Sequence, residues 1–169
     1  MAATVEIRSY HEAGGDTPDS GVDKAGGTVR FKAADNDTVD ANNPIVIPGG
    51  GTAYSFLKQF RYYAATTPTN SLDNLKFYMD AANNYGTGIS LQCKQAAAWT
   101  NPVTLGSADA TSCTDAFTYT SGNPLAITGS WSSGTGPFGN YLKVQLTVAN
   151  TAPQGTTASE SITFSYDES

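Results

Sequence analysis

The residue best suited to acid–base chemistry near neutral pH in this chain is His11, its single histidine. Glu12 follows it, but a zinc-binding His-Glu-x-x-His pair would need a second histidine where Gly15 stands. A Ser-His-Asp arrangement would require His11 to act from a flexible glycine-rich segment, and the sequence nominates no partner for it. We therefore expect His11 to be a solvent-exposed loop residue without a catalytic role.

An oxygen-rich run, Asp35-Asn36-Asp37-Thr38-Val39-Asp40, raises the question of calcium binding. An EF-hand loop that starts at Asp35 would need glycine at its sixth place and glutamate at its twelfth, and these places hold Asp40 and Ile47. The favoured interpretation is a turn whose side chains hydrogen-bond their own backbone, with a calcium site as the alternative.

Sugar chemistry would need either paired carboxylates for hydrolysis or exposed aromatic rings for binding. Nothing in the sequence brings together any two of the carboxylates Glu160, Asp167 and Glu168. Trp99, Trp131 and the nine tyrosines could form a sugar-stacking platform, although such residues more often close a core or fill a protein interface.

Two further patterns match chemical motifs only in part. The run from Gly134 to Gly139 reads G-x-G-x-x-G, but a strand and not a helix is expected to follow it, and Pro137 removes one backbone amide. We expect a wide glycine loop there. Cys93 and Cys113 lack the paired spacing of a metal site, so a disulfide between them and a buried free thiol at Cys93 both remain open. No catalytic constellation emerges, and we predict neither an enzyme nor a cofactor or metal site.

Charge and composition narrow the class of protein further. Lys plus Arg number 9 and Asp plus Glu 15, so the net charge is −6, which argues against a protein that binds nucleic acid through its phosphates. Charged residues make up only 14% of the chain, too few to coat many surface helices. No apolar run is long enough to span a membrane and the start of the chain lacks a signal-peptide pattern, so we expect synthesis in the cytoplasm and no membrane contact.

The elements that must position these residues are strands, because apolar residues recur with period two throughout. We predict a single all-β domain over residues 1–169, an antiparallel β-sandwich of jelly-roll or Ig-like type with eight to ten short strands. The two last strands are expected to form a hairpin. In the aromatic strand, Phe56, Phe60 and Tyr62 are the favoured core face, and a helical turn is plausible only at 96–99. The expected strands cover residues 5–10, 29–31, 45–47, 54–64, 75–79, 89–93, 116–120, 125–131, 141–148 and 162–166.

The C-terminal part of the chain resembles small structural proteins of tailed-bacteriophage virions. The resemblance lies in Leu142-Lys-Val-Gln-Leu-Thr-Val, the turn Thr151-Ala-Pro-Gln-Gly-Thr and the closing Ile162-Thr-Phe-Ser-Tyr-Asp-Glu. Asn74-Leu-Lys-Phe-Tyr-Met is similar to an internal strand of those proteins. The whole resemblance covers about a third of the chain, and alternating strands with a Pro-Gly turn also occur in many other β-sandwiches.

The resemblance implies a capsid decoration or auxiliary head protein, located on the exterior of the virion. Its partner would be the major capsid protein, and a homo-oligomer, most simply a trimer, is expected. Residues 1–27 would be an N-terminal arm for assembly, since a glycine-rich segment is costly to order without a partner. The alternative is a carbohydrate- or receptor-binding module of the head-fibre or adhesin type, with a tryptophan exposed beside polar side chains. The candidate interface residues are Val5, Ile7, Arg8, Tyr10 and His11.

Overall fold

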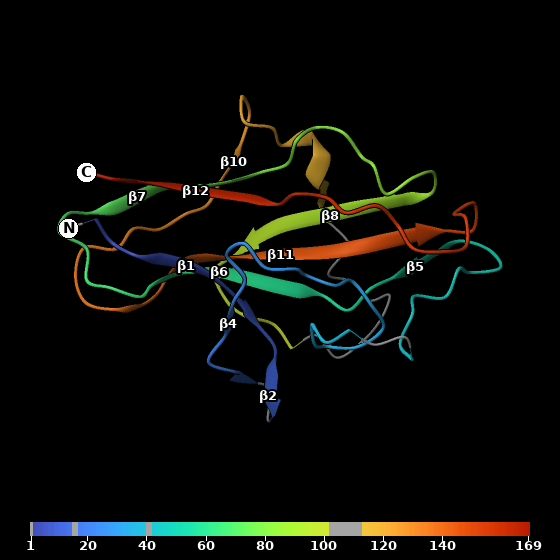
Figure 1. The fold of residues 1–169 in the computed structure, drawn as a ribbon, viewed down its shortest axis with the longest axis horizontal. Coiled ribbons are helices and arrows are strands. Elements are labelled where there is room, and N and C mark those ends of the chain that lie inside the picture. The colour runs from blue at the N-terminus through green and yellow to red at the C-terminus, as the bar shows by residue number, and fades with distance from the viewer. Residues whose placement is uncertain (1, 15–16, 40–41, 102–112) are drawn as a thin grey trace.

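The computed structural model describes residues 2–14, 17–39, 42–101 and 113–169. The fold is all-β with antiparallel sheets, as the sequence predicts. Twelve strands are present among these residues, and six of them have only two or three residues, which accounts for the excess over the eight to ten expected. Figure 1 shows a large sheet below a smaller one, with both chain ends at the same end of the molecule.

The larger sheet has seven strands, in the order β4-β1-β6-β11-β8-β9, and β5 pairs with β11. Its centre is β11, the longest strand, which pairs with β6 on one side and β8 on the other. The strands are β1 (Val5–Tyr10), β4 (Val22–Asp23), β5 (Thr52–Tyr54), β6 (Lys58–Ala64), β8 (Ile89–Ala96), β9 (Thr114–Asp115) and β11 (Gly136–Ala149).

The smaller sheet has three strands in the order β10-β7-β12, and they are β10 (Leu125–Ala126), β7 (Leu72–Tyr78) and β12 (Thr163–Glu168). Separate from both sheets, β2 (Glu12–Gly14) pairs with β3 (Thr17–Pro18) as a small two-stranded element. A 3₁₀ turn spans Ala116–Thr118.

The core lies between the two sheets and consists of the residues that alternation assigns to the inner faces. Phe60 and Tyr62 of β6 face Phe77 of β7 and Phe164 of β12, with ring centroids about 6 Å apart where Phe164 meets the other three. The favoured core face of the aromatic strand is thus confirmed at Phe60 and Tyr62.

A buried tyrosine hydroxyl ties the two sheets together. Tyr62 is 1% exposed, and its hydroxyl lies 2.7 Å from the carbonyl of Lys76 and 2.9 Å from that of Ser165. It also accepts a hydrogen bond from the Lys76 amide. The pairing of β7 with β12 shifts register just beyond Ser165, so the hydroxyl occupies the place where the ladder is irregular.

The predicted C-terminal hairpin is wrong, although both of its strands exist. β11 lies in the larger sheet, whereas β12 crosses to the smaller one and pairs with β7. Residues 150–162 therefore connect the two sheets. Alternation reveals that a strand has one buried face, but it carries no information about which strand lies beside it.

Several shorter predictions also need correction. The expected strand at 54–64 is broken, because the hydroxyl of Ser55 accepts the hydrogen bond from the Leu146 amide and replaces a rung of the ladder. The expected strands at 29–31 and 45–47 do not form, and both segments are irregular. The expected helical turn at 96–99 is instead the last residue of β8 followed by a bend. The expected strand at 116–120 begins with the 3₁₀ turn. Of the expected strand at 125–131 only Leu125–Ala126 forms, with an isolated bridge at Trp131.

The start of the chain is built into the sandwich. β1 pairs with β6 over six residue pairs, from Val5 opposite Ala64 to Tyr10 opposite Gln59. The carboxylate of Glu168 near the C-terminus accepts hydrogen bonds from the amides of Ala3 and Thr69. The part of residues 1–27 that does project from the sandwich is the β2–β3 element, seen at the bottom of Figure 1.

Candidate functional site

The most concentrated group of ionisable side chains surrounds Asp37, whose side chain is 7% exposed. Its Oδ1 lies 3.0 Å from Nζ of Lys58, and its Oδ2 lies 2.9 Å from Nζ of Lys24 and 3.4 Å from Nε2 of His11. Nδ1 of His11 lies 3.5 Å from Oδ2 of Asp19. We call Asp19, His11, Lys24, Asp37 and Lys58 the Asp37 cluster.

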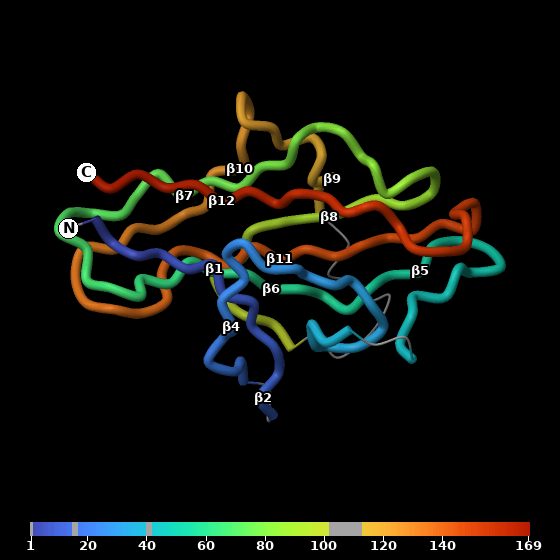
Figure 2. Tube along the Cα trace, viewed as in Figure 1, coloured from blue at the N-terminus to red at the C-terminus, as the bar shows by residue number. Residues whose placement is uncertain are grey.

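Lys58 lies on the same face of β6 as the core residues Phe60 and Tyr62, so the cluster lies at the inner face of the larger sheet. Lys58 and the segment around Asp37 come together because Lys58 Nζ donates to the Asn36 carbonyl and the Phe56 amide donates to the Lys32 carbonyl. The Thr38 amide donates to the side chain of Asn36, so the predicted turn is confirmed there, while Asp40 lies outside the described residues. Figure 2 traces this segment in blue to cyan alongside β6.

The expectation that His11 is solvent-exposed is wrong, since its side chain is only 14% exposed. Contact with Asp37 raises the pKa of His11 against the opposing effects of burial and Lys58. Burial acts to raise the pKa of Asp37, but contacts with His11, Lys24 and Lys58 outweigh it and hold that pKa well below its usual range. Burial lowers the pKa of Lys58 even though Asp37 opposes the shift.

By residue type, Ser9, His11 and Asp19 are the members of a Ser-His-Asp triad. Nε2 of His11 lies 3.5 Å from the Ser9 hydroxyl, but the same nitrogen faces Asp37 at 3.4 Å. Ser9 is 0% exposed, so no substrate reaches its hydroxyl in this conformation. The arrangement fixes the segment around Asp37 to the sheet by charge.

The described residues contain neither a group of side chains that could hold a metal ion nor a disulfide. No three of their His, Cys, Asp or Glu side chains are placed to hold an ion, and two lysines occupy the carboxylate of Asp37 instead. No disulfide joins Cys93 and Cys113, which decides between the two alternatives. Cys93 is 1% exposed, and burial raises the pKa of its thiol to about 12.

The run from Gly134 to Gly139 has a structural explanation. β11 begins within it at Gly136, so the predicted glycine loop is shorter than expected. Gly139 has φ +69° at the irregularity between Phe138 and Leu142, and a Cβ there would lie 2.7 Å from Leu75 Cδ1. A Cβ on Gly129 would lie 2.4 Å from the Cα of Gly139, so glycine at these two positions allows the two backbone segments to pack closely.

The five predicted interface residues are placed on both faces of β1. Val5 and Ile7 pack against the core, and His11 belongs to the Asp37 cluster. Tyr10 is 5% exposed and packs edge to face with Tyr141. These four are used within the fold, and their role in assembly stays a prediction.

Arg8, the fifth, belongs to a group on the outer face of the larger sheet. Its guanidinium lies 3.3 Å from the ring centroid of Tyr63, and the guanidinium of Arg61 lies 4.8 Å from that of Tyr141. Nε of Arg8 is 2.8 Å from a carboxylate oxygen of Glu6, and the side chains of both are about one-fifth exposed. Both guanidinium groups of this face are thus used within the fold, since Arg8 also donates to the Ser20 carbonyl and Arg61 to the Gly139 carbonyl.

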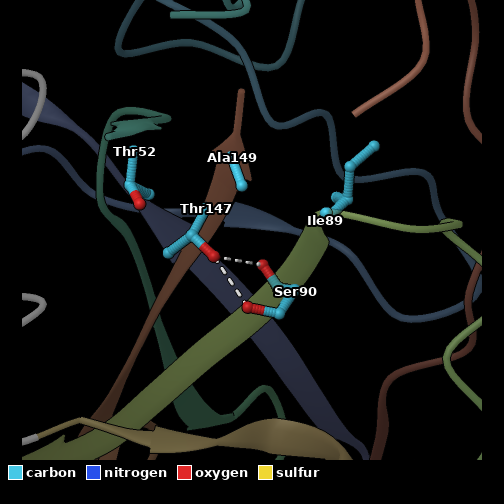
Figure 3. Close-up of a pocket in the computed structure, with 6 residues that line it drawn as sticks. Thr52, Ile89, Ser90, Thr147 and Ala149 are labelled. Atoms are coloured by element: carbon cyan, nitrogen blue, oxygen red, sulfur yellow. Dashed lines mark hydrogen bonds between the residues drawn. The ribbon is translucent and has the colours of Figure 1, made fainter. Parts of the chain in front are cut away.

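Two hollows of the described surface carry hydroxyl groups beside apolar side chains in their linings. One, of about 330 Å³, lies between β5, β8 and β11, where the hydroxyls of Ser90 and Thr147 are 2.7 Å apart (Figure 3). A second, of about 350 Å³, lies beside Tyr78 and Thr120.

Both tryptophans are half-buried. The ring of Trp131 stacks on Phe138 at 6.0 Å between centroids, and its Nε1 donates to the Gly134 carbonyl. Nε1 of Trp99 is enclosed. The exposed tryptophan that a sugar-binding module would present is thus not found among the described residues.

No protein family model matches this chain, and neither a curated protein nor a solved structure matches it. The described residues include no helix of the length and hydrophobicity that a membrane span requires.

Proposed function

We propose that the protein is a structural component of a tailed-bacteriophage virion that binds the outer surface of the capsid and stabilises the shell. The observation that carries the proposal is the projecting β2–β3 element: Glu12–Gly14 and Thr17–Pro18 are exposed throughout, stand away from the sandwich and lead into a glycine-rich segment. Such a segment gains most from being ordered by a partner. The resemblance of the C-terminal strands to virion proteins supports the same assignment.

The physical mechanism is preferential binding to the assembled state. A subunit that binds the assembled shell and not loose coat protein adds its binding free energy to the stability of the shell. Repetition over a symmetric lattice makes many modest contacts effective together. The rigid sandwich presents the β2–β3 element to the major capsid protein.

The test is sedimentation with intact phage particles from cells that carry this gene. The full chain should sediment with the particles, and a variant in which residues 13–17 are replaced by two glycines should remain in the supernatant. The matched control shortens the exposed segment 153–159 by the same number of residues and should sediment like the full chain. Failure of the full chain to sediment contradicts the proposal, and equal sedimentation of both shortened variants shows that the β2–β3 element is not the contact.

A further inference from the structure

The projecting β2–β3 element is closed at its base by His11 and Asp19. The chain leaves the sandwich after β1, forms the element and returns at Asp19. The Asp19 amide donates to the His11 carbonyl at 2.8 Å, and the His11 amide donates to Oδ1 of Asp19 at 3.1 Å. The imidazole adds a third contact, since Nδ1 of His11 lies 3.5 Å from Oδ2 of Asp19. The attachment of the element to the sandwich therefore includes one contact that depends on a titratable side chain.

The two ring nitrogens of His11 face two different carboxylates. Nδ1 faces Asp19, and Nε2 lies 3.4 Å from Oδ2 of Asp37, which is paired to β6 through Lys58. A protonated imidazole carries a hydrogen on both nitrogens and can donate to both carboxylates, whereas a neutral imidazole has only one hydrogen to donate. The geometry therefore fits the protonated form of His11.

Asp19 is the carboxylate that depends on the charge of His11. Asp37 also pairs with Lys24 at 2.9 Å and Lys58 at 3.0 Å, so it keeps two cations when the imidazole is neutral. Among the described residues, no lysine or arginine forms an ion pair with Asp19. Whichever ring nitrogen keeps its hydrogen, deprotonation removes the full charge that attracts Asp19.

The groups around His11 come from β1, from β6 and from the segments between them. They are Ser9, Asp19, Lys24, Asp35, Asp37 and Lys58. Contact with Asp37 outweighs burial and the nearby Lys58, so the pKa of His11 is raised above its ordinary value of about 6.5. The imidazole therefore loses its proton in neutral to mildly alkaline solution.

We propose that His11 is a proton-controlled hinge: its protonated ring holds the returning strand β3 at Asp19, and loss of the proton releases that strand from the sandwich. The first strand has an anchor that does not involve His11. The Glu12 amide donates to the carboxylate of Asp35, and the Asn101 side chain donates to the carboxylate of Glu12. Release therefore affects Thr17 more than Glu12.

The consequence of the hinge for capsid binding rests on the function proposed above, in which the β2–β3 element is the contact. An element that is already ordered binds its partner at a smaller entropic cost. Binding to the shell should therefore be tighter in mildly acidic solution, where His11 is protonated. The hinge itself is a property of the isolated chain and can be measured without particles.

The test is NMR of the ¹⁵N-labelled full chain between about pH 5.5 and about pH 8.5. His11 is the only histidine, so its imidazole signals report the titration of a single group. The steady-state heteronuclear NOE of the Thr17 amide should fall as pH rises, with the midpoint of the imidazole titration, and that of Glu12 should fall less. A Thr17 NOE that does not change with pH, or that changes with a different midpoint, overturns the hinge.

Two variants and a matched control separate the hinge from a general effect of pH. His11→Gln should abolish the pH dependence of the Thr17 NOE. Asp19→Asn should shift the His11 midpoint to lower pH and leave the Thr17 NOE low throughout, and it serves alone if His11→Gln disturbs the near-ultraviolet circular dichroism. Asp23→Asn, the same change at an exposed carboxylate, should behave like the wild type. An Asp19→Asn variant with the wild-type titration and NOE contradicts the proposal.

Sedimentation with phage particles at about pH 6 and about pH 8.5 distinguishes the two proposals. A smaller bound fraction at the higher pH, absent in His11→Gln, supports the use of the hinge in capsid binding, and equal fractions overturn that use. A chain that sediments at neither pH contradicts the capsid function, while the Thr17 and His11 titrations still decide the hinge.

Discussion

At the scale of single residues, Asp37 matters because its carboxylate forms an ion pair with the buried side chain of Lys58. Lys58 is 0% exposed at its side chain, and among the described residues its ion pair is with Asp37. Removing one partner of a buried ion pair leaves an uncompensated charge, which typically costs about 3–5 kcal/mol. Asp37→Asn should therefore lower the free energy of unfolding by about 3 kcal/mol in urea titrations at neutral pH.

The control for this substitution is Asp23→Asn, which makes the same chemical change at an exposed carboxylate and should shift stability by less than about 0.5 kcal/mol. Adding Lys58→Met to Asp37→Asn should recover part of the loss, because the unpaired ammonium is then gone. Equal stability of the two Asp→Asn variants would contradict the role of the cluster.

His11 makes the same cluster sensitive to pH. Its folded-state pKa is raised, chiefly by Asp37, so its contribution is complete below the unfolded pKa of about 6.5 and is lost as pH rises through the folded pKa. The other groups that face it are Asp19, Asp35, Asp37, Lys58 and the Ser9 hydroxyl.

Urea midpoints should fall between about pH 6 and pH 8.5 in the wild type, and the difference from His11→Gln should narrow over that range. Asp37 acts in the opposite sense: its depressed pKa gives stability above about pH 4 that is lost on acidification. Together, the two effects make the cluster's contribution to the free energy of unfolding greatest in mildly acidic solution. A His11→Gln variant whose difference from the wild type does not change with pH would refute this assignment.

At the scale of elements, the two sheets are joined by the Tyr62 hydroxyl as well as by apolar packing. Tyr62→Phe keeps the ring but leaves the buried backbone groups of Lys76 and Ser165 without this partner, which should cost about 1–3 kcal/mol. Tyr63→Phe, one residue along, keeps the ring on which Arg8 lies and should cost less than about 0.5 kcal/mol. Thermal or urea unfolding of the two variants measures the difference, and indistinguishable midpoints would contradict a stabilising role of the Tyr62 hydroxyl between the sheets.

The sequence predicts strands better than it predicts their partners. Alternation locates β1, β7, β8, β11 and β12, because each has one face in the core. It cannot reveal that β12 leaves β11 for β7, since both pairings bury Phe164 equally well. The Asp37 cluster was missed for a related reason: His11 and Asp37 meet across irregular chain, where no periodic pattern marks which polar residues become buried.

At the scale of the whole molecule, the place of β1 decides how the N-terminal segment can be studied. Deleting residues 1–27 would remove all six residue pairs between β1 and β6, together with the His11, Asp19 and Lys24 side chains that surround Asp37. It would also expose one edge of β6 along its length. We therefore expect this truncation to lose the sharp near-ultraviolet circular dichroism and cooperative unfolding of the full chain.

The shorter replacement of residues 13–17 spares β1 and should retain both. If the 1–27 deletion unfolds cooperatively with an unchanged midpoint, β1 is dispensable, and the N-terminal segment is a detachable arm despite its pairing with β6.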